Sequence, residues 1–187
     1  MRVFDFDDTI YDGESLLDFY IFSIRYNPRV LKYAFIVMYH TLMYRMGKTT
    51  IESLEKVIRK HARGYLTSFE DIDSVAKDFW DKKMPTKIKK WYIPQKDDII
   101  LTASFDIIMY ELFRRLSLTD SVCSEYNRKT MQAEYINFSS NKPIRFREKF
   151  GDATVDEFYT DSMFDAPMIE MAKKAYLVKK DKITQIK

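Results

Sequence analysis

Glycine, proline, histidine and cysteine are all scarce in this chain. Its 187 residues include four glycines, five prolines, two histidines and one cysteine. So little glycine and proline argues against a flexible linker, and we find no internal repeat. The single cysteine, Cys123, excludes a disulfide within the chain and suits a reducing compartment. Because no histidine lies near it in the sequence, we interpret Cys123 as a packed side chain.

The chain also lacks a strong net charge and a long apolar run. Its formal charge of +3 is too small to indicate a nucleic-acid partner, and none is expected. Early aspartates such as Asp5 and Asp7 interrupt any signal peptide, and the most apolar stretch, 33–44, is shorter than the ~20 residues that span a membrane. Because 46% of the residues are hydrophobic and 32% are charged, we expect a folded domain. Its expected location is the cytoplasm.

The first half of the chain has helical periodicity after a short opening strand, "VFDF". Apolar residues recur at three- and four-residue intervals, and threonine and glutamate recur at the spacing of capping boxes. The helices are expected over 14–26, over 29–46, from a box of Thr49 and Glu52 to Gly64, and after a second box of Thr67 and Glu70.

From residue 97 onward, strand and helix patterns alternate. The run "DDIILTAS" at 97–104 is continuous and apolar and ends in small polar residues, which is typical of a central parallel strand with a site at its end. This order predicts an α/β protein. Its core would be discontinuous, formed by residues 1–12 and 97–187, and residues 13–96 would be an α-helical cap inserted after the first strand.

Acidic side chains collect where predicted strands end. Residues two apart on a strand point the same way, so Asp5 and Asp7 are expected to project together from the carboxyl end of the first strand. Open α/β sheets bind ligands at that edge, and paired carboxylates there favour Mg²⁺. The turn "TDSMFD" adds Asp161 and Asp165 after another predicted strand.

A hydroxyl group and an amine are expected to join these acids. Thr102 ends the predicted strand "IILT", and Lys142 precedes the predicted helix "PIRFREKF". Carboxylates, a hydroxyl and a lysine together suit a metal ion and a phosphate dianion. Asp165 also stands where it would cap the helix that begins at "APMIEMA".

Four segments resemble the motifs of the haloacid dehalogenase (HAD) superfamily, in the family's order. "DFDDT" is similar to the first motif, DxDxT, "IILTAS" to the second, Lys142 to the third, and "DSMFDAPMIEMA" to the acidic fourth. Lys129 and Lys149 are other candidates for the third motif. Four motifs in order are far more specific than one. The resemblance implies a Rossmann-like parallel-sheet core, and the helical insert resembles the branch of phosphoserine phosphatases and bacterial phosphatidylglycerophosphate phosphatases.

The resemblance also implies a Mg²⁺-dependent hydrolase that cleaves a small-molecule phosphomonoester through an aspartyl-phosphate. Asp5 would be the nucleophile, and Asp7 would protonate the leaving oxygen and then act as the base toward water. Thr102 and Lys142 would complete the catalytic set. The implied phosphate-binding groups are Thr102, Ala103, Ser104 and Lys142, and the implied Mg²⁺ ligands are Asp5, Asp7 through its carbonyl, Asp161 and, in support, Asp165.

Asp7 favours phosphoryl transfer over dehalogenation, because a halide leaving group needs no proton and the dehalogenases lack this second aspartate. Asp8 stands where many relatives have glycine. Three alternatives remain open: a phosphomutase, a membrane-proximal lipid-phosphate phosphatase, and a non-catalytic regulatory protein that binds phosphate.

The apolar stretch at 33–44 has two interpretations. One stripe of the expected helix is apolar, and further apolar residues spread around it. Burial in the cap, or in a homodimer contact, is favoured. The alternative is peripheral contact with a membrane, to which the basic and aromatic run at 82–92 would contribute. The stripe consists of Leu31, Ala34, Phe35, Met38 and Leu42.

Overall fold

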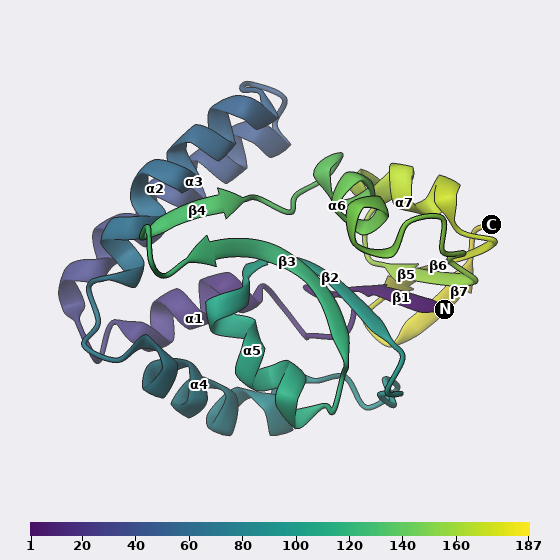
Figure 1. The fold of residues 1–187 in the computed structure, drawn as a ribbon, viewed down its shortest axis with the longest axis horizontal. Coiled ribbons are helices and arrows are strands. Elements are labelled where there is room, and N and C mark those ends of the chain that lie inside the picture. The colour runs from purple at the N-terminus through teal and green to yellow at the C-terminus, as the bar shows by residue number, and fades with distance from the viewer.

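A mostly parallel sheet of seven strands forms the centre of the protein (Figure 1). The computed structural model describes residues 1–187 except for the side chain of Ala34, so the Ala34 position of the predicted stripe lies outside the described residues. The strand order is β4-β3-β2-β1-β5-β6-β7, with β4 and β7 antiparallel at the two edges. The predicted α/β fold with a Rossmann-like core is therefore confirmed. The strands are β1 (Arg2–Asp5), β2 (Ile99–Phe105), β3 (Asp120–Asn127), β4 (Gln132–Tyr135), β5 (Glu157–Thr160), β6 (Lys174–Lys179) and β7 (Lys182–Gln185).

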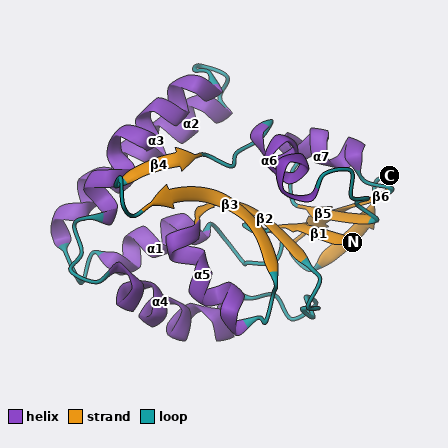
Figure 2. Ribbon diagram, viewed as in Figure 1, coloured by secondary structure: helices purple, strands orange, loops and turns teal.

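Successive residues of the central strands supply two different apolar cores, one on each face of the sheet. Val3 and Leu101 pack with α6 (Asn141–Phe150) and α7 (Ala166–Met171), whereas Phe4 and Ile100 belong to the cluster on the other face. This alternation follows from the two-residue period of a strand. Cys123 is buried in the second cluster, which confirms its interpretation as a packed side chain. Figure 2 shows helices on both sides of the strands.

Four α-helices are inserted between β1 and β2, as the sequence predicts. Trp80 on α4 is fully buried and donates Nε1–H to the carbonyl of Ile108 on α5 at 2.8 Å. One apolar cluster runs from the inserted helices to the sheet. The exact division into a core and a cap stays a prediction. The inserted helices are α1 (Ser15–Ser23), η1 (Pro28–Val30), α2 (Leu31–Arg45), α3 (Ile51–Leu66) and α4 (Ile72–Lys87), and α5 (Asp106–Arg115) follows β2.

The starts of α3 and α4 differ from the two predicted capping boxes. Thr50 rather than Thr49 caps α3. Asp71 rather than Thr67 caps α4, because its carboxylate accepts two backbone N–H bonds of the first turn, at 3.0 and 3.1 Å. Gly64 does not end α3 but lies inside it, where the ring and hydroxyl of Tyr33 on α2 occupy the space that a side chain would take.

The predicted stripe of α2 is open to solvent. Phe35 is 57% exposed and Leu42 is 52% exposed, so the favoured interpretation of burial within the cap is wrong for this face. Part of the basic run at 82–92 has an internal role: Lys89 is buried and donates to the carbonyls of Asp8 and Lys180, whereas Lys82 and Lys90 are exposed. Among the described residues, no helix combines the length and apolar character needed to cross a membrane.

Candidate active site

A buried ion-pair cluster lies at the carboxyl end of β1, the central strand. Lys142, in the first turn of α6, places Nζ 2.6 Å from Oδ1 of Asp5 and 3.0 Å from Oδ2 of Asp165. The hydroxyl of Thr160, the last residue of β5, lies 3.0 Å from that same Asp165 oxygen. Thr9 donates to Oδ2 of Asp5 at 3.4 Å. The structure thus brings together three residues that the sequence predicts for the site: Asp5, Lys142 and Asp165.

The cluster carries more negative than positive charge. Burial, with the charges of Asp165 and Asp161, raises the pKa of Asp5 well above its usual range, although Lys142 opposes the shift. Burial alone would lower the pKa of Lys142, but attraction to Asp5 and Asp165 outweighs it and holds that pKa above its ordinary value. Lys142 therefore stays charged and faces more than one carboxylate. A further cation at this edge would relieve the excess.

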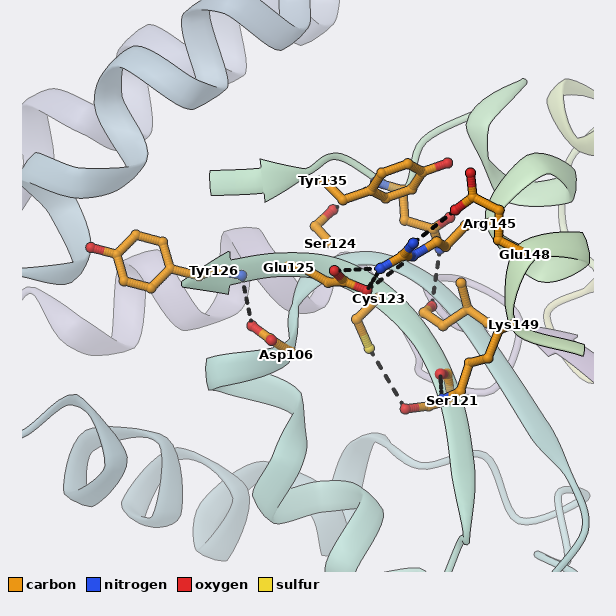
Figure 3. Close-up of polar contacts among 12 residues, drawn as sticks. Asp106, Ser121, Cys123, Ser124, Glu125, Tyr126, Tyr135, Arg145, Glu148 and Lys149 are labelled. Atoms are coloured by element: carbon orange, nitrogen blue, oxygen red, sulfur yellow. Dashed lines mark hydrogen bonds and ion pairs between the residues drawn. The ribbon is translucent and has the colours of Figure 1, made fainter. Parts of the chain in front are cut away.

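Helix α6 is tied to the sheet by an arginine three residues after Lys142 (Figure 3). Arg145 Nε lies 3.0 Å from Oε1 of Glu125 on β3, and Nη2 lies 2.6 Å from Oε2. Arg145 also contacts Glu148 on its own helix at 2.7 Å. A two-pronged contact of this kind defines the orientation as well as the position of the helix. The first turn of α6, and with it Lys142, is thereby held over β1.

Asp7 contacts helix α1 and shares no hydrogen-bond partner with Asp5 among the described residues. Strand β1 ends at Asp5, two residues before Asp7. The Asp7 carboxylate instead accepts the backbone N–H of Ser15 at 2.6 Å. Burial raises the pKa of Asp7 to about 7, and the Ser15 hydrogen bond only partly opposes this. A carboxyl group with such a pKa both gives and takes protons near neutral pH.

Thr102, Ala103 and Ser104 lie beside the end of β1, within β2, which continues past the predicted end at Thr102. Leu101 is paired with Asp5, so these three residues follow directly on the neighbouring strand. The pairing of β2 with β3 becomes irregular after Leu101, and such an irregularity redirects side chains near a site. The N–H of Ser104, predicted to bind phosphate, donates to Oγ1 of Thr102 at 3.1 Å.

Asp161 follows β5 and is half-buried near Asp5. Its pKa is raised, first by burial and then by the charge of Asp8. Within the described part of the chain, no three acidic, histidine or cysteine side chains converge as metal ligands. Carboxylate oxygen atoms such as those of Asp5 and Asp161 are the hard donors that Mg²⁺ prefers. Asp165 is already engaged by Lys142, and although it holds the N-cap position of α7, its carboxylate caps no N–H.

A cavity of about 410 Å³ opens beside Asp7 and Ser104. Its polar wall also includes Glu14 and Arg45, which form an ion pair at 2.8 Å. The remaining wall is almost entirely apolar and comes from α1, α2, α3, the end of β2 and the segment after β4. Among the apolar lining residues are Leu16, Tyr20, Val37, Ile58, Phe105 and Phe138.

Sequence reasoning missed several residues that organise this edge. Ser15 donates its N–H to Asp7, and its hydroxyl lies 3.1 Å from that of Ser104. Asn137 donates Nδ2–H to the carbonyls of Thr102 and Val122, both at 3.0 Å, and so joins β2 to β3. Such contacts depend on the assembled sheet. Ser15 alone had a local signal, since serine is common at the start of a helix.

The chain resembles a known protein family and several solved structures. The family model for haloacid dehalogenase-like hydrolases matches residues 3–170. A protein of unknown function from Bordetella pertussis Tohama I is similar with a TM-score of 0.71 and 14% identity, over 94% of this chain and 87% of that one. A phosphoserine phosphohydrolase-like protein from Francisella tularensis subsp. tularensis SCHU S4 gives a TM-score of 0.60 and 16% identity, over 94% of this chain and 86% of that one. Because the sequence identities are low, these structural matches show a shared fold only. Comparison with curated protein sequences gave no significant match.

Proposed function

The chain belongs to the haloacid dehalogenase-like hydrolase family, and we propose that it is a Mg²⁺-dependent phosphatase that hydrolyses a small phosphomonoester through an aspartyl-phosphate. One observation carries the proposal: Lys142 contacts both Asp5 and Asp165 at the carboxyl end of the central strand. This edge of an open α/β sheet is where such folds bind ligands. The likeness in fold to a phosphoserine phosphohydrolase-like protein supports the same reaction class.

In the first half-reaction, a carboxylate oxygen of Asp5 attacks phosphorus. A bond forms between Asp5 and the phosphoryl group, the ester P–O bond breaks, and Asp7 gives its proton to the departing alkoxide. The pKa of about 7 for Asp7 supports this role, because the group is partly protonated at neutral pH. Lys142 and Thr102 would stabilise the charge shared by the phosphoryl oxygens and Asp5.

In the second half-reaction, water attacks the phosphorus of the acyl phosphate. Asp7, now ionised, takes a proton from that water as the bond to Asp5 breaks, which restores both carboxyl groups and releases inorganic phosphate. Mg²⁺ held by the carboxylates of Asp5 and Asp161 and the carbonyl of Asp7 would neutralise charge on the phosphate throughout. Asp165 keeps Lys142 in place for this chemistry.

The direct test is phosphate release from a panel of monoesters, with and without Mg²⁺, by the native chain and by Asp5→Asn. We expect Asp5→Asn to abolish turnover, since an amide is a poor nucleophile. Asp12→Asn is the matched control, because Asp12 is an exposed aspartate of the same loop. Substantial turnover by a correctly folded Asp5→Asn variant would contradict the assignment of the nucleophile.

The same measurement separates the two alternative functions. A phosphomutase would return the phosphoryl group to a substrate molecule, so that inorganic phosphate would not accumulate. A regulatory phosphate-binding protein would bind the ester and release nothing. The raised pKa values of both Asp5 and Asp7 favour an enzyme, because a site that only binds phosphate has no use for two costly buried acids.

A further inference from the structure

Helix α2 presents one apolar face to solvent. The apolar residues of this face recur at three- and four-residue intervals, so they lie on one side of the helix. Their exposed fractions range from 41% to 58%. On the adjoining helix α1, Leu17 and Ile21 are exposed as well, at 39% and 59%. An apolar surface of this extent marks a contact with a partner or a membrane. The α1–α2 face comprises Leu17, Ile21, Leu31, Phe35, Met38, Tyr39, Leu42 and Met46.

Basic side chains predominate among the charges near this face, because the two acids at the start of α1, Glu14 and Asp18, are paired with Arg45 and Lys83 at 2.8 and 3.2 Å. Between Asp18 and Glu52 the sequence contains no acidic residue, but it does contain several arginines and lysines. Four of these, Arg25, Arg29, Lys32 and Lys48, are exposed. An apolar helix face bordered by basic side chains is typical of helices that lie in an anionic lipid interface. A second copy of this chain fits less well, because a two-fold contact would bring like charges together.

The α1–α2 face is continuous with the cavity beside Asp7. Leu17, Met38 and Leu42 belong to the exposed face and also line the cavity, which reaches Asp7 and Ser104 at its other end. Between these two ends the wall is mainly apolar. A polar leaving group such as a sugar would lose its hydrogen bonds to water along this path without replacing them, whereas a hydrocarbon chain would not.

We propose that the α1–α2 face docks on an anionic lipid surface, and that the cavity receives the hydrocarbon part of a phosphate monoester held in that surface. The substrate part of this inference rests on the proposed phosphatase function, whereas the docking part does not. The phosphate would lie at Asp5 and the apolar chain would leave between α1 and α2 toward the lipid.

Docking is tested by sedimentation of the full chain with phosphatidylcholine vesicles that contain or lack phosphatidylglycerol. We expect binding that requires phosphatidylglycerol and weakens with salt. The double variant Phe35→Glu, Tyr39→Glu should bind about tenfold more weakly or worse, because two aromatic side chains no longer enter the lipid. The control is Tyr110→Glu on α5, where an exposed tyrosine lies outside the α1–α2 face. No binding at low salt, or equal binding by the double variant, would overturn the docking proposal, as would a dimer that buries this face.

The substrate class is tested by phosphate release from n-decyl phosphate and from ethyl phosphate. We expect kcat/KM to favour the decyl ester by about tenfold or more, since apolar pockets reward added methylenes. Thr41→Trp places a larger side chain on the cavity wall and narrows the cavity, so it should reduce that ratio. Hydrolysis of p-nitrophenyl phosphate serves as the measure of the phosphatase function itself. If that ester is cleaved but the decyl preference is absent, the substrate inference is wrong and the proposed function stands. If none of the three esters is cleaved, the proposed function fails and the vesicle experiment still decides the docking.

Discussion

Lys142 and Asp5 are 137 positions apart in the chain, yet Nζ of one lies 2.6 Å from Oδ1 of the other, and both residues are buried. The contact joins the first turn of α6 to the end of β1. It explains how a carboxylate is tolerated at the end of a buried central strand: the folded sheet brings an ammonium group to it, and that ammonium group also holds Asp165.

The first prediction concerns this contact. Lys142→Met leaves Asp5 and Asp165 buried without their shared partner, and breaking one side of a buried ion pair costs about 3–5 kcal/mol. We expect the free energy of unfolding in urea to fall by that order, and phosphate release to fall by about a hundredfold or more. Lys149→Met on the same helix is the control, since Lys149 is exposed. Equal losses in both variants would mean that the buried contact has no special role.

The second prediction concerns pH. The folded protein holds the Asp7 proton up to about pH 7, whereas an unperturbed carboxyl releases it near pH 3.8. Ionisation of Asp7 therefore destabilises the folded state. The stability that protonated Asp7 contributes is lost as pH rises between those values. Asp7→Asn removes the titration and keeps an oxygen for the Ser15 N–H. Without divalent ions, we expect the free energy of unfolding of the variant to exceed that of the native chain by about 1–3 kcal/mol between about pH 5 and about pH 8.

Urea unfolding of both proteins across this pH range measures the difference. The activity of Asp7→Asn should be low at every pH, because the variant cannot transfer a proton. A constant difference in stability from acid to alkaline pH would show that Asp7 does not titrate in the folded protein as its burial implies.

The third prediction concerns the metal. Chelation of divalent ions should abolish phosphate release, and added Mg²⁺ should restore it. Asp161→Asn removes one of the carboxylates expected to hold the ion, so the Mg²⁺ concentration that gives half-maximal rate should rise by about tenfold or more. A titration of the rate with Mg²⁺ measures this shift. Asp152→Asn, at an exposed aspartate elsewhere, should leave the titration unchanged. Undiminished turnover after chelation would exclude a role for divalent ions.

The sequence was sufficient to locate the candidate site because its residues stand at strand ends. Asp5 and Thr102 end up on neighbouring strands since parallel strands place their carboxyl ends at the same edge. The third motif was harder, because Lys129, Lys142 and Lys149 are all lysines in one region. Only the assembled fold separates them: Lys142 faces Asp5, whereas Lys149 donates to the carbonyl of Ser121.

Helical periodicity was least informative about α2. It showed which residues share a face, but a face that is apolar can meet either a core or a lipid, and the pattern is the same for both. The start of α4 was misplaced for a related reason. The Thr67–Glu70 spacing matches a capping box, but Asp71 offers a carboxylate that accepts two N–H groups and so determines where the helix begins.

The last prediction concerns the position of α6. Arg145→Met removes the contacts to Glu125 and Glu148 but no group that touches Lys142. If the arginine orients the helix, kcat should fall by about tenfold while KM changes little, because a small displacement of Lys142 weakens the stabilisation of the transition state more than binding. Arg147→Met is the control on the same helix, since Arg147 is exposed and contacts only backbone carbonyls of the following turn. Arg145→Lys, which keeps the charge but not the two-pronged contact, should restore part of the rate. If kcat is unaffected in Arg145→Met, the ion pair stabilises the surface of the protein without positioning Lys142.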